Sequence, residues 1–206
     1  MKRTTTATGL LALAAMLVLG VFAGSASAGG GPNSFFLWTG PLPGLVLVLS
    51  DNEQIFTSEP GGPPIECEHF GGHAFASNGK AMTTKEVTLT GVYTKCFAAN
   101  LFPATVSPVA FLLNADGSIT ILNPIVITVP ELGCSLKLAN NTANTNLRLL
   151  LFLNRKEDLL VHSDVRNLTS LSSGDPCGAA GVEHPEGTYA GLLLAFVHGG
   201  ILQWRK

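Results

Sequence analysis

The sequence has few charged residues, and those of positive sign are scattered. Only 13% of its 206 residues are charged, and no basic run is longer than two residues. Low charge combined with 46% hydrophobic residues disfavours intrinsic disorder. The sequence predicts no nucleic-acid partner, because proteins that bind nucleic acids gather lysine and arginine on one surface.

Sequence signatures of common active sites are absent as well. Beyond the first 28 residues the chain contains no G-x-S-x-G, G-x-G-x-x-G or Walker pattern. It has no C-x-x-C pair, and its cysteine spacings fit no zinc finger or zinc ribbon. These absences favour a non-enzymatic protein that carries no metal and no cofactor.

The first 28 residues have the pattern of a secretory signal peptide. Two basic residues precede an apolar stretch over residues 10–22, and the segment ends in the small-x-small triplet Ala26-Ser27-Ala28. Cleavage between Ala28 and Gly29 removes two of the 12 cations and none of the 14 carboxylates, so the mature formal charge is −4. The sequence therefore predicts a protein that is secreted to the extracellular space or held in the cell envelope.

The mature chain has four cysteines, and an even number in an exported protein predicts disulfides. The sequential pairing, Cys67–Cys96 and Cys134–Cys177, is favoured over the two other connectivities. Each loop that it closes is of moderate length and contains strand-like sequence that can return the chain. A metal site is the alternative use of these cysteines.

Period-two patterns dominate the chain. Residues 85–93 and 159–168 alternate between apolar and polar positions, as half-buried strands do. The apolar runs 109–113 and 118–122 flank an Asp-Gly turn at residues 116–117, which predicts a hairpin. Strand candidates recur about every ten residues without an amphipathic helical stripe, which indicates an all-β fold. We expect an antiparallel β-sandwich or barrel stabilised by two disulfides.

Composition divides the chain into a signal peptide (1–28), an N-terminal extension with short strands (29–64) and a β-domain (65–206). A single domain that begins at about residue 33 is the alternative. Residues 170–187 are rich in Ser, Gly and Pro and are expected to form a long loop tethered by Cys177. The uncharged tail 187–204 contains four glycines, which favours a closing strand, so no transmembrane span is expected in the mature chain.

Two histidines lie close to the first cysteine. His69 and His73 are four residues apart, as zinc ligands on a helix are, but Gly71 and Gly72 between them disfavour a helix. A polar loop beside the disulfide is therefore favoured for this segment. A weak metal site is the alternative.

The segment around residue 162 contains residue types found in hydrolases. His162 and Asp164 share one face of the expected strand with Arg166, which favours a solvated polar face over a catalytic one. Glu157 and Asp158 are adjacent, and neighbours on a strand point to opposite faces, so they do not form a glycosidase pair. A secreted hydrolase that uses His162 or the His69/His73 pair remains an alternative.

Several short segments carry a resemblance to a group of known proteins. The chain resembles uncharacterised secreted, β-rich proteins of high-GC soil actinobacteria that have four cysteines. The resemblance covers about residues 65–195 and implies a disulfide-stabilised β-domain outside the membrane, with no activity or site residue to transfer. The segments that carry it are 26–28, 88–96, 114–121, 133–135 and 186–191.

Three functions are compatible with these patterns. Export, disulfides and the lack of catalytic motifs favour a non-enzymatic structural or interaction module, associated with the cell envelope or free outside the cell. The apolar bias also fits a β-barrel that carries apolar small molecules. A hydrolase is the third hypothesis. An enclosed apolar cavity would distinguish the carrier, and a converging Ser, His and carboxylate would distinguish the hydrolase.

Overall fold

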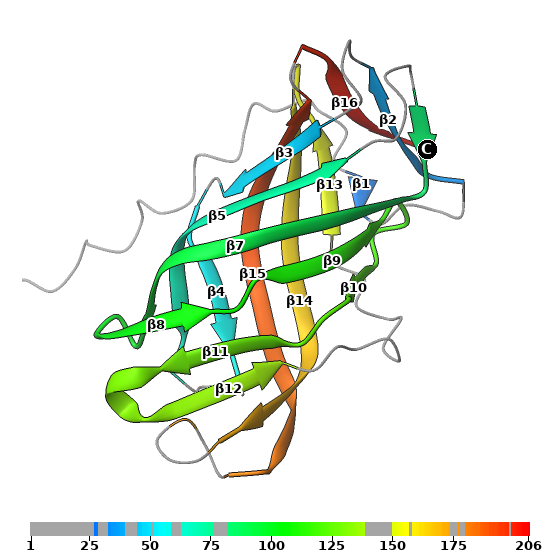
Figure 1. Cartoon of the computed structure of the whole chain (residues 1–206). Helices are drawn as coiled ribbons and strands as arrows, with labels where there is room; N and C mark the ends of the chain where they lie inside the picture. The colour runs from blue at the N-terminus through cyan, green and yellow to red at the C-terminus, as the bar shows by residue number, and fades with distance from the viewer. Residues whose placement is uncertain are drawn as a thin grey trace, which may run out of the picture.

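The computed structural model covers the whole chain (Figure 1) and describes most of it. The described residues are 27–28, 33–39, 45–50, 52–58, 63–75, 82–138, 150–156, 158–173, 177, 180–197 and 199–206. Ala28 of the expected cleavage site lies in the first strand. Gly29, Glu157 and the part of the expected leader before Ser27 lie outside the described residues.

The described elements are sixteen strands and one 3-10 turn, η1 (Pro130–Leu132). The strands are β1 (Ser27–Ala28), β2 (Phe35–Thr39), β3 (Leu45–Ser50), β4 (Gln54–Thr57), β5 (Ile65–Phe75), β6 (Met82–Thr84), β7 (Glu86–Ala98), β8 (Phe102–Val106), β9 (Val109–Asn114), β10 (Ile119–Ile121), β11 (Ile125–Val129), β12 (Cys134–Leu138), β13 (Leu150–Asn154), β14 (Asp158–Ser172), β15 (Glu183–Val197) and β16 (Ile201–Arg205).

The main sheet closes on itself into an antiparallel barrel of eight strands with extra strands attached. The order β14-β12-β11-β8-β7-β5-β3-β15 returns to its start because β15 also pairs with β14. The long strands β14 and β15 run side by side along the barrel, and the long strand β7 runs across them (Figure 1). Each of the three pairs with different short strands at its two ends. The predicted all-β fold with two disulfides is confirmed, and the architecture is a barrel rather than a sandwich.

A second, smaller sheet lies at one end of the barrel. Its strand order is β16-β2-β6. Asn154 at the end of β13 connects this sheet to the wall, since its side chain donates to Trp204 O at 2.7 Å and accepts from Trp204 N at 2.7 Å. The short strands expected between residues 29 and 64 are β2, β3 and β4, and β3 and β4 pair with β5 and β15 in the barrel.

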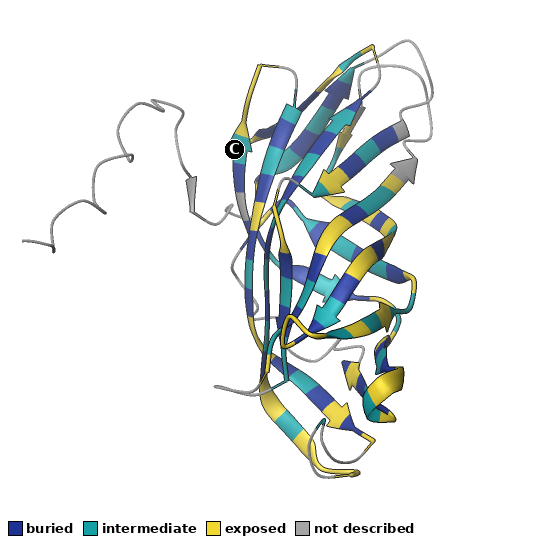
Figure 2. Cartoon of the chain, turned by 90° about the vertical axis from the view of Figure 1, so that its left-hand side faces the viewer, coloured by how far each residue is buried: buried dark blue, intermediate teal, exposed yellow. Residues whose placement is uncertain are grey.

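Alternation along each strand separates the core from the surface (Figure 2). In β15 every second residue from Gly187 to Val197 is buried, and β14 follows the same pattern except at a bulge. At that bulge Asn167 has φ 59° and the register to β15 shifts between Val165 and Leu168. Period-two burial of this kind is the physical basis of the alternating sequence pattern.

Two expectations about loops are wrong. The segment around His69 and His73 is not a polar loop but part of β5, which pairs with β3 and β4 on one side and β7 on the other. The long loop expected at 170–187 is shorter, because β14 runs to Ser172 and β15 begins at Glu183. In both places backbone pairing on neighbouring strands overrides the local preference of Gly, Pro and polar residues.

The Asp-Gly hairpin is confirmed between β9 and β10. Asn114 N donates to Ser118 O at 2.9 Å, Gly117 N donates to Asn114 O at 2.9 Å, and Gly117 has φ 91°. This positive φ favours glycine because a Cβ is strained there. We expect Gly117→Ala to lower the free energy of unfolding by about 1 kcal/mol or more. Chemical denaturation measures this loss. Gly117→Asn is the control, since asparagine tolerates a positive φ better than alanine does. Equal stability of Gly117→Ala and the wild type would contradict the prediction.

Candidate functional site

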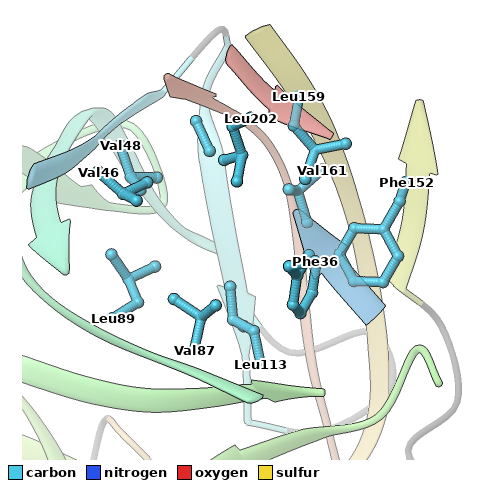
Figure 3. Close-up of a pocket in the computed structure, with 11 residues that line it drawn as sticks. Phe36, Val46, Val48, Val87, Leu89, Leu113, Phe152, Leu159, Val161 and Leu202 are labelled. Atoms are coloured by element: carbon cyan, nitrogen blue, oxygen red, sulfur yellow. The ribbon is translucent and has the colours of Figure 1, made fainter. Parts of the chain in front are cut away.

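The interior of the barrel is the place where a small molecule would bind, and it is apolar at the end covered by the small sheet. A cavity of about 20 Å³ lies there (Figure 3). Its volume corresponds to about one water molecule, and no polar side chain lines it. The lining residues are Phe36, Val46, Val48, Val87, Leu89, Leu113, Phe152, Leu159, Val161, Ala195 and Leu202.

Aromatic residues from the small sheet fill much of this end. Phe36 packs edge-on against Phe152 with ring centroids 5.2 Å apart, and Trp204 stacks on Phe152 at 5.8 Å. Trp204 Nε1 donates to Ala115 O at 2.7 Å, so the polar atom of this buried side chain is satisfied. The end of the barrel is therefore packed with side chains rather than open.

Deeper in the barrel, along β7 and β15, a polar group of three side chains lies within the core. Tyr93 OH donates to Tyr189 OH at 3.2 Å, and Tyr189 OH donates to Gln54 Oε1 at 2.6 Å. Gln54 Nε2 in turn donates to Leu192 O at 3.2 Å and to Asn52 O at 2.9 Å. Gln54 is fully buried, and both tyrosines are buried as well.

Aromatic rings enclose this polar group. Phe56 lies 5.1 Å from Tyr93 and 4.9 Å from Tyr189 between ring centroids, and Phe70 lies 4.8 Å from Tyr93. Gly191 makes room for the amide, since a Cβ at this position would lie 2.6 Å from Gln54 Cδ. The arrangement orients Gln54 and the two tyrosines in one bonding pattern.

Burial changes the acidity of both tyrosines. Loss of hydration raises the pKa of Tyr189 to about 12, although the hydrogen bond from Tyr93 opposes this rise. The pKa of Tyr93 is raised well above its ordinary value, mainly by loss of hydration and to a smaller extent by the nearby Tyr189. Both phenols are neutral at physiological pH, so they act as hydrogen-bond donors and are unsuited to act as general bases.

A matched pair of substitutions tests this polar group. Tyr189→Phe leaves Gln54 Oε1 buried without its donor, so we expect the free energy of unfolding to fall by about 1–3 kcal/mol. Tyr93→Phe keeps the bond from Tyr189 to Gln54 and is expected to cost about 0.5–1.5 kcal/mol. Urea denaturation of the two variants measures the difference, and equal losses would contradict the assigned bonding order.

The raised pKa values predict how stability depends on pH. A tyrosine whose pKa is higher in the folded than in the unfolded chain stabilises the fold fully below pH 10, and this contribution is lost as pH rises toward about 12. The wild type should therefore lose stability steeply above pH 10. Tyr189→Phe should show a shallower loss in denaturation experiments across this pH range, whereas identical slopes would contradict the assignment.

The structure places the histidines of the metal hypothesis on the outer surface of β5. His69 and His73 are both exposed, and four residues along a strand span about 13 Å, which is too far for one metal ion. Glu68 lies between Lys95, whose Nζ is 2.8 Å from Glu68 Oε2, and His69. The hydrogen bond from Lys95 lowers the pKa of Glu68. Within the described ranges no group of three potential metal-ligating side chains occurs.

The residues of the hydrolase hypothesis are separated by the pleat of β14. His162 is exposed on the outside, whereas the adjacent Ser163 is buried on the inside. Asp164 forms an ion pair with Arg166, in which Arg166 Nη2 lies 3.1 Å from Asp164 Oδ2. The predicted solvated face thus matches the positions of His162, Asp164 and Arg166, and these side chains do not converge with a serine.

The four cysteines form the sequential pairs. Cys67 on β5 faces its register partner Cys96 on β7, both inside the barrel, and Cys134 at the start of β12 is bonded to Cys177 between β14 and β15. Among the described residues none forms a helix of the length and apolarity that a membrane span requires. Comparison with family models, curated proteins and solved structures finds no match for this chain.

Sequence reasoning did not single out Gln54, Tyr93 and Tyr189 as a group. Tyr93 belongs to the alternating segment expected at residues 85–93, and it lies inside the barrel. Gln54 is a polar residue in a four-residue strand, and its burial follows from pairing between β4, β5 and β15. A buried glutamine has no signature of its own in a single sequence.

Proposed function

We propose that this protein is a non-enzymatic interaction module that works outside the cell or in the cell envelope. The observation that carries the proposal is the packing of the barrel under the small sheet, where the cavity described above holds about one water molecule. A drug-sized ligand needs a site of about 300 Å³ or more. We therefore expect binding partners to contact the outer surface of the barrel.

The separation of reactive side chains supports the non-enzymatic part of this proposal. His162 and Ser163 point to opposite faces of β14, and His69 and His73 are spread along the outside of β5. The tyrosines inside the barrel are kept neutral by burial and are occupied by hydrogen bonds to each other and to Gln54. No described group brings a nucleophile, a base and an open cleft together.

The leader pattern and the disulfides support export. Two disulfides are consistent with an oxidising compartment. Cleavage after Ala28 would remove β1, the two-residue strand that pairs with Phe152 and Leu151 of β13. N-terminal sequencing of protein recovered outside the cell should begin at or near Gly29, and recovery of a form that begins at Met1 would contradict the leader assignment.

The second candidate is a carrier of apolar small molecules, which the all-apolar lining of the cavity favours. Titration with a fluorescent fatty acid distinguishes the two functions. We expect no saturable binding to the wild type, because the cavity has no room for an alkyl chain. Saturable binding of one molecule per chain, lost in the cavity-filling variant Ala195→Leu, would instead support the carrier.

A further inference from the structure

The two disulfides differ in how far the surrounding chain buries them. Cys67 and Cys96 have 0% and 4% of their surface exposed, and Cys134 has 3%. Cys177 is half-buried, so it is the most exposed of the four cysteines. Thiol–disulfide exchange begins when a thiolate reaches one sulfur of the bond, so access decides which of the two disulfides reacts.

The position of the Cys67–Cys96 bond explains its protection. The two cysteines are register partners on β5 and β7 and lie inside the barrel. On its other side Cys67 lies opposite Gln54 of β4. Cys96 in the same way lies opposite Ala104 of β8. A thiol therefore reaches this bond only when the barrel opens.

The Cys134–Cys177 bond lies at the end of the barrel away from the small sheet (Figure 1). Cys134 is the first residue of β12 and pairs with Val129 of β11, whereas Cys177 lies between β14 and β15. The ladder between β12 and β14 reaches the pair of Leu136 and Ser172. The bond thus lies beyond the last described pair of this ladder, where a small thiol can approach it without opening the wall.

Hydrogen bonds hold both ends of the chain between β14 and β15 independently of this disulfide. Ser173 N donates to Ser135 O at 2.9 Å, and Ser173 Oγ accepts from Ser135 N at 2.7 Å. At the other end, Gly181 N donates to Ser172 O at 3.0 Å. Cleavage of the disulfide therefore leaves the barrel wall intact and its two cysteines near each other, so the bond can form again.

We propose that Cys134–Cys177 is a reversible redox site that reacts with dithiols, whereas Cys67–Cys96 is a structural cross-link. This chemistry is additional to the proposed function and does not depend on it. In the first step a thiolate of the dithiol bonds to Cys177 Sγ, the bond from Cys177 to Cys134 breaks, and Cys134 Sγ leaves as a thiolate that takes up a proton. In the second step the other thiolate of the dithiol bonds to the first sulfur of the dithiol, and Cys177 Sγ leaves and is protonated. The protein disulfide gains two electrons, and the dithiol is oxidised to a disulfide.

Reduction of the folded, exported chain by dithiothreitol tests this proposal. Samples are quenched with iodoacetamide at intervals, and mass spectrometry of the cysteine peptides shows which thiols have formed. Because access limits the exchange, we expect Cys134 and Cys177 to be alkylated about tenfold or more faster than Cys67 and Cys96. Far-UV circular dichroism should stay unchanged while only this bond is reduced, and oxidised glutathione should restore it once dithiothreitol is removed.

Two single variants test which sulfur a thiolate can reach. Cys134→Ser leaves the thiol of the half-buried Cys177, and Cys177→Ser leaves the thiol of the buried Cys134. We expect iodoacetamide to modify the free thiol of Cys134→Ser about tenfold or more faster than that of Cys177→Ser. Circular dichroism shows whether each variant is folded, and the reduction of the wild type does not depend on either of them.

Four outcomes overturn the proposal. Two of them are equal rates of reduction for the two disulfides and earlier reduction of Cys67–Cys96. The third is resistance of both bonds to dithiothreitol until the chain unfolds. The fourth is loss of the β-sheet signal as Cys134–Cys177 is reduced, since this bond would then be a structural cross-link as well. Equal alkylation of the two single variants would overturn the assignment of Cys177 as the sulfur that is attacked.

Discussion

Replacement of Cys67 and Cys96 by alanine is expected to lower the free energy of unfolding by about 4 kcal/mol. The two residues are 29 positions apart in sequence. Closing a loop of this length lowers the conformational entropy of the unfolded chain, which destabilises the unfolded state by about 4 kcal/mol. Both cysteines are buried inside the barrel, so the substitution also removes core contacts. Guanidinium denaturation of the double variant measures the loss.

The second disulfide provides the comparison. The Cys134–Cys177 bond closes a loop of 43 residues, and Cys177 lies between β14 and β15 rather than in a strand. Replacing both cysteines should increase hydrogen exchange mainly over residues 170–187, whereas loss of Cys67 and Cys96 should increase it around His69 and His73. Identical exchange patterns in the two double variants would contradict this assignment, and free thiols in the exported protein would contradict both disulfides.

Gly91→Ala is expected to destabilise the barrel by about 2–3 kcal/mol, because it forces a side chain into a packed core. Gly91 lies on the inside of β7, beneath the ring of Phe70. A Cβ at this position would overlap that ring and lie 2.8 Å from Gly71 O. Phe70 in turn packs on Tyr93 at 4.8 Å, so its ring cannot move without disturbing the polar group around Gln54.

The neighbouring strand supplies a matched control for Gly91→Ala. Gly71 on β5 is close in register, being opposite Val92, but a Cβ there would meet no atom within 4 Å. Gly71→Ala should therefore leave the free energy of unfolding unchanged or raise it slightly, since alanine restricts the unfolded chain. Thermal denaturation of both variants is the measurement. Equal stability of the two variants would show that the interior at Phe70 is loosely packed.

The local sequence pattern was sufficient to predict a strand where one face of that strand is buried and the other is exposed to solvent. The alternating segment at 85–93 became part of β7, and the expected hairpin formed around Gly117. Along a strand the side chains alternate between the two faces because of the backbone geometry, so the strand can be predicted without knowing which strands lie beside it. The cysteine pairing that the sequence favoured is also the pairing in the structure, but the sequence left two other connectivities open.

Pairing between distant strands decided what local pattern could not. Residues 65–75 are rich in Gly, His and Glu and looked like a loop, yet they form a central strand because β3, β4 and β7 use their backbone groups. Barrel closure depends on the pairing of β14 with β15 and of β12 with β14. A closed barrel and a sandwich have the same alternation along each strand, so the sequence left both open.

The sequence by itself determined the all-β class and the hairpin turn, since both depend on residue type and short spacing. Only the tertiary structure decided which surfaces are free and which side chains meet. Gln54 and Tyr189 are 135 residues apart in the sequence, and their hydrogen bond forms because β4 pairs with β15. Likewise Leu49 and Leu160 both lie opposite Leu194, because β3 and β14 pair with the two sides of β15. Register across a closed sheet sets such neighbours, and register is a property of the whole barrel.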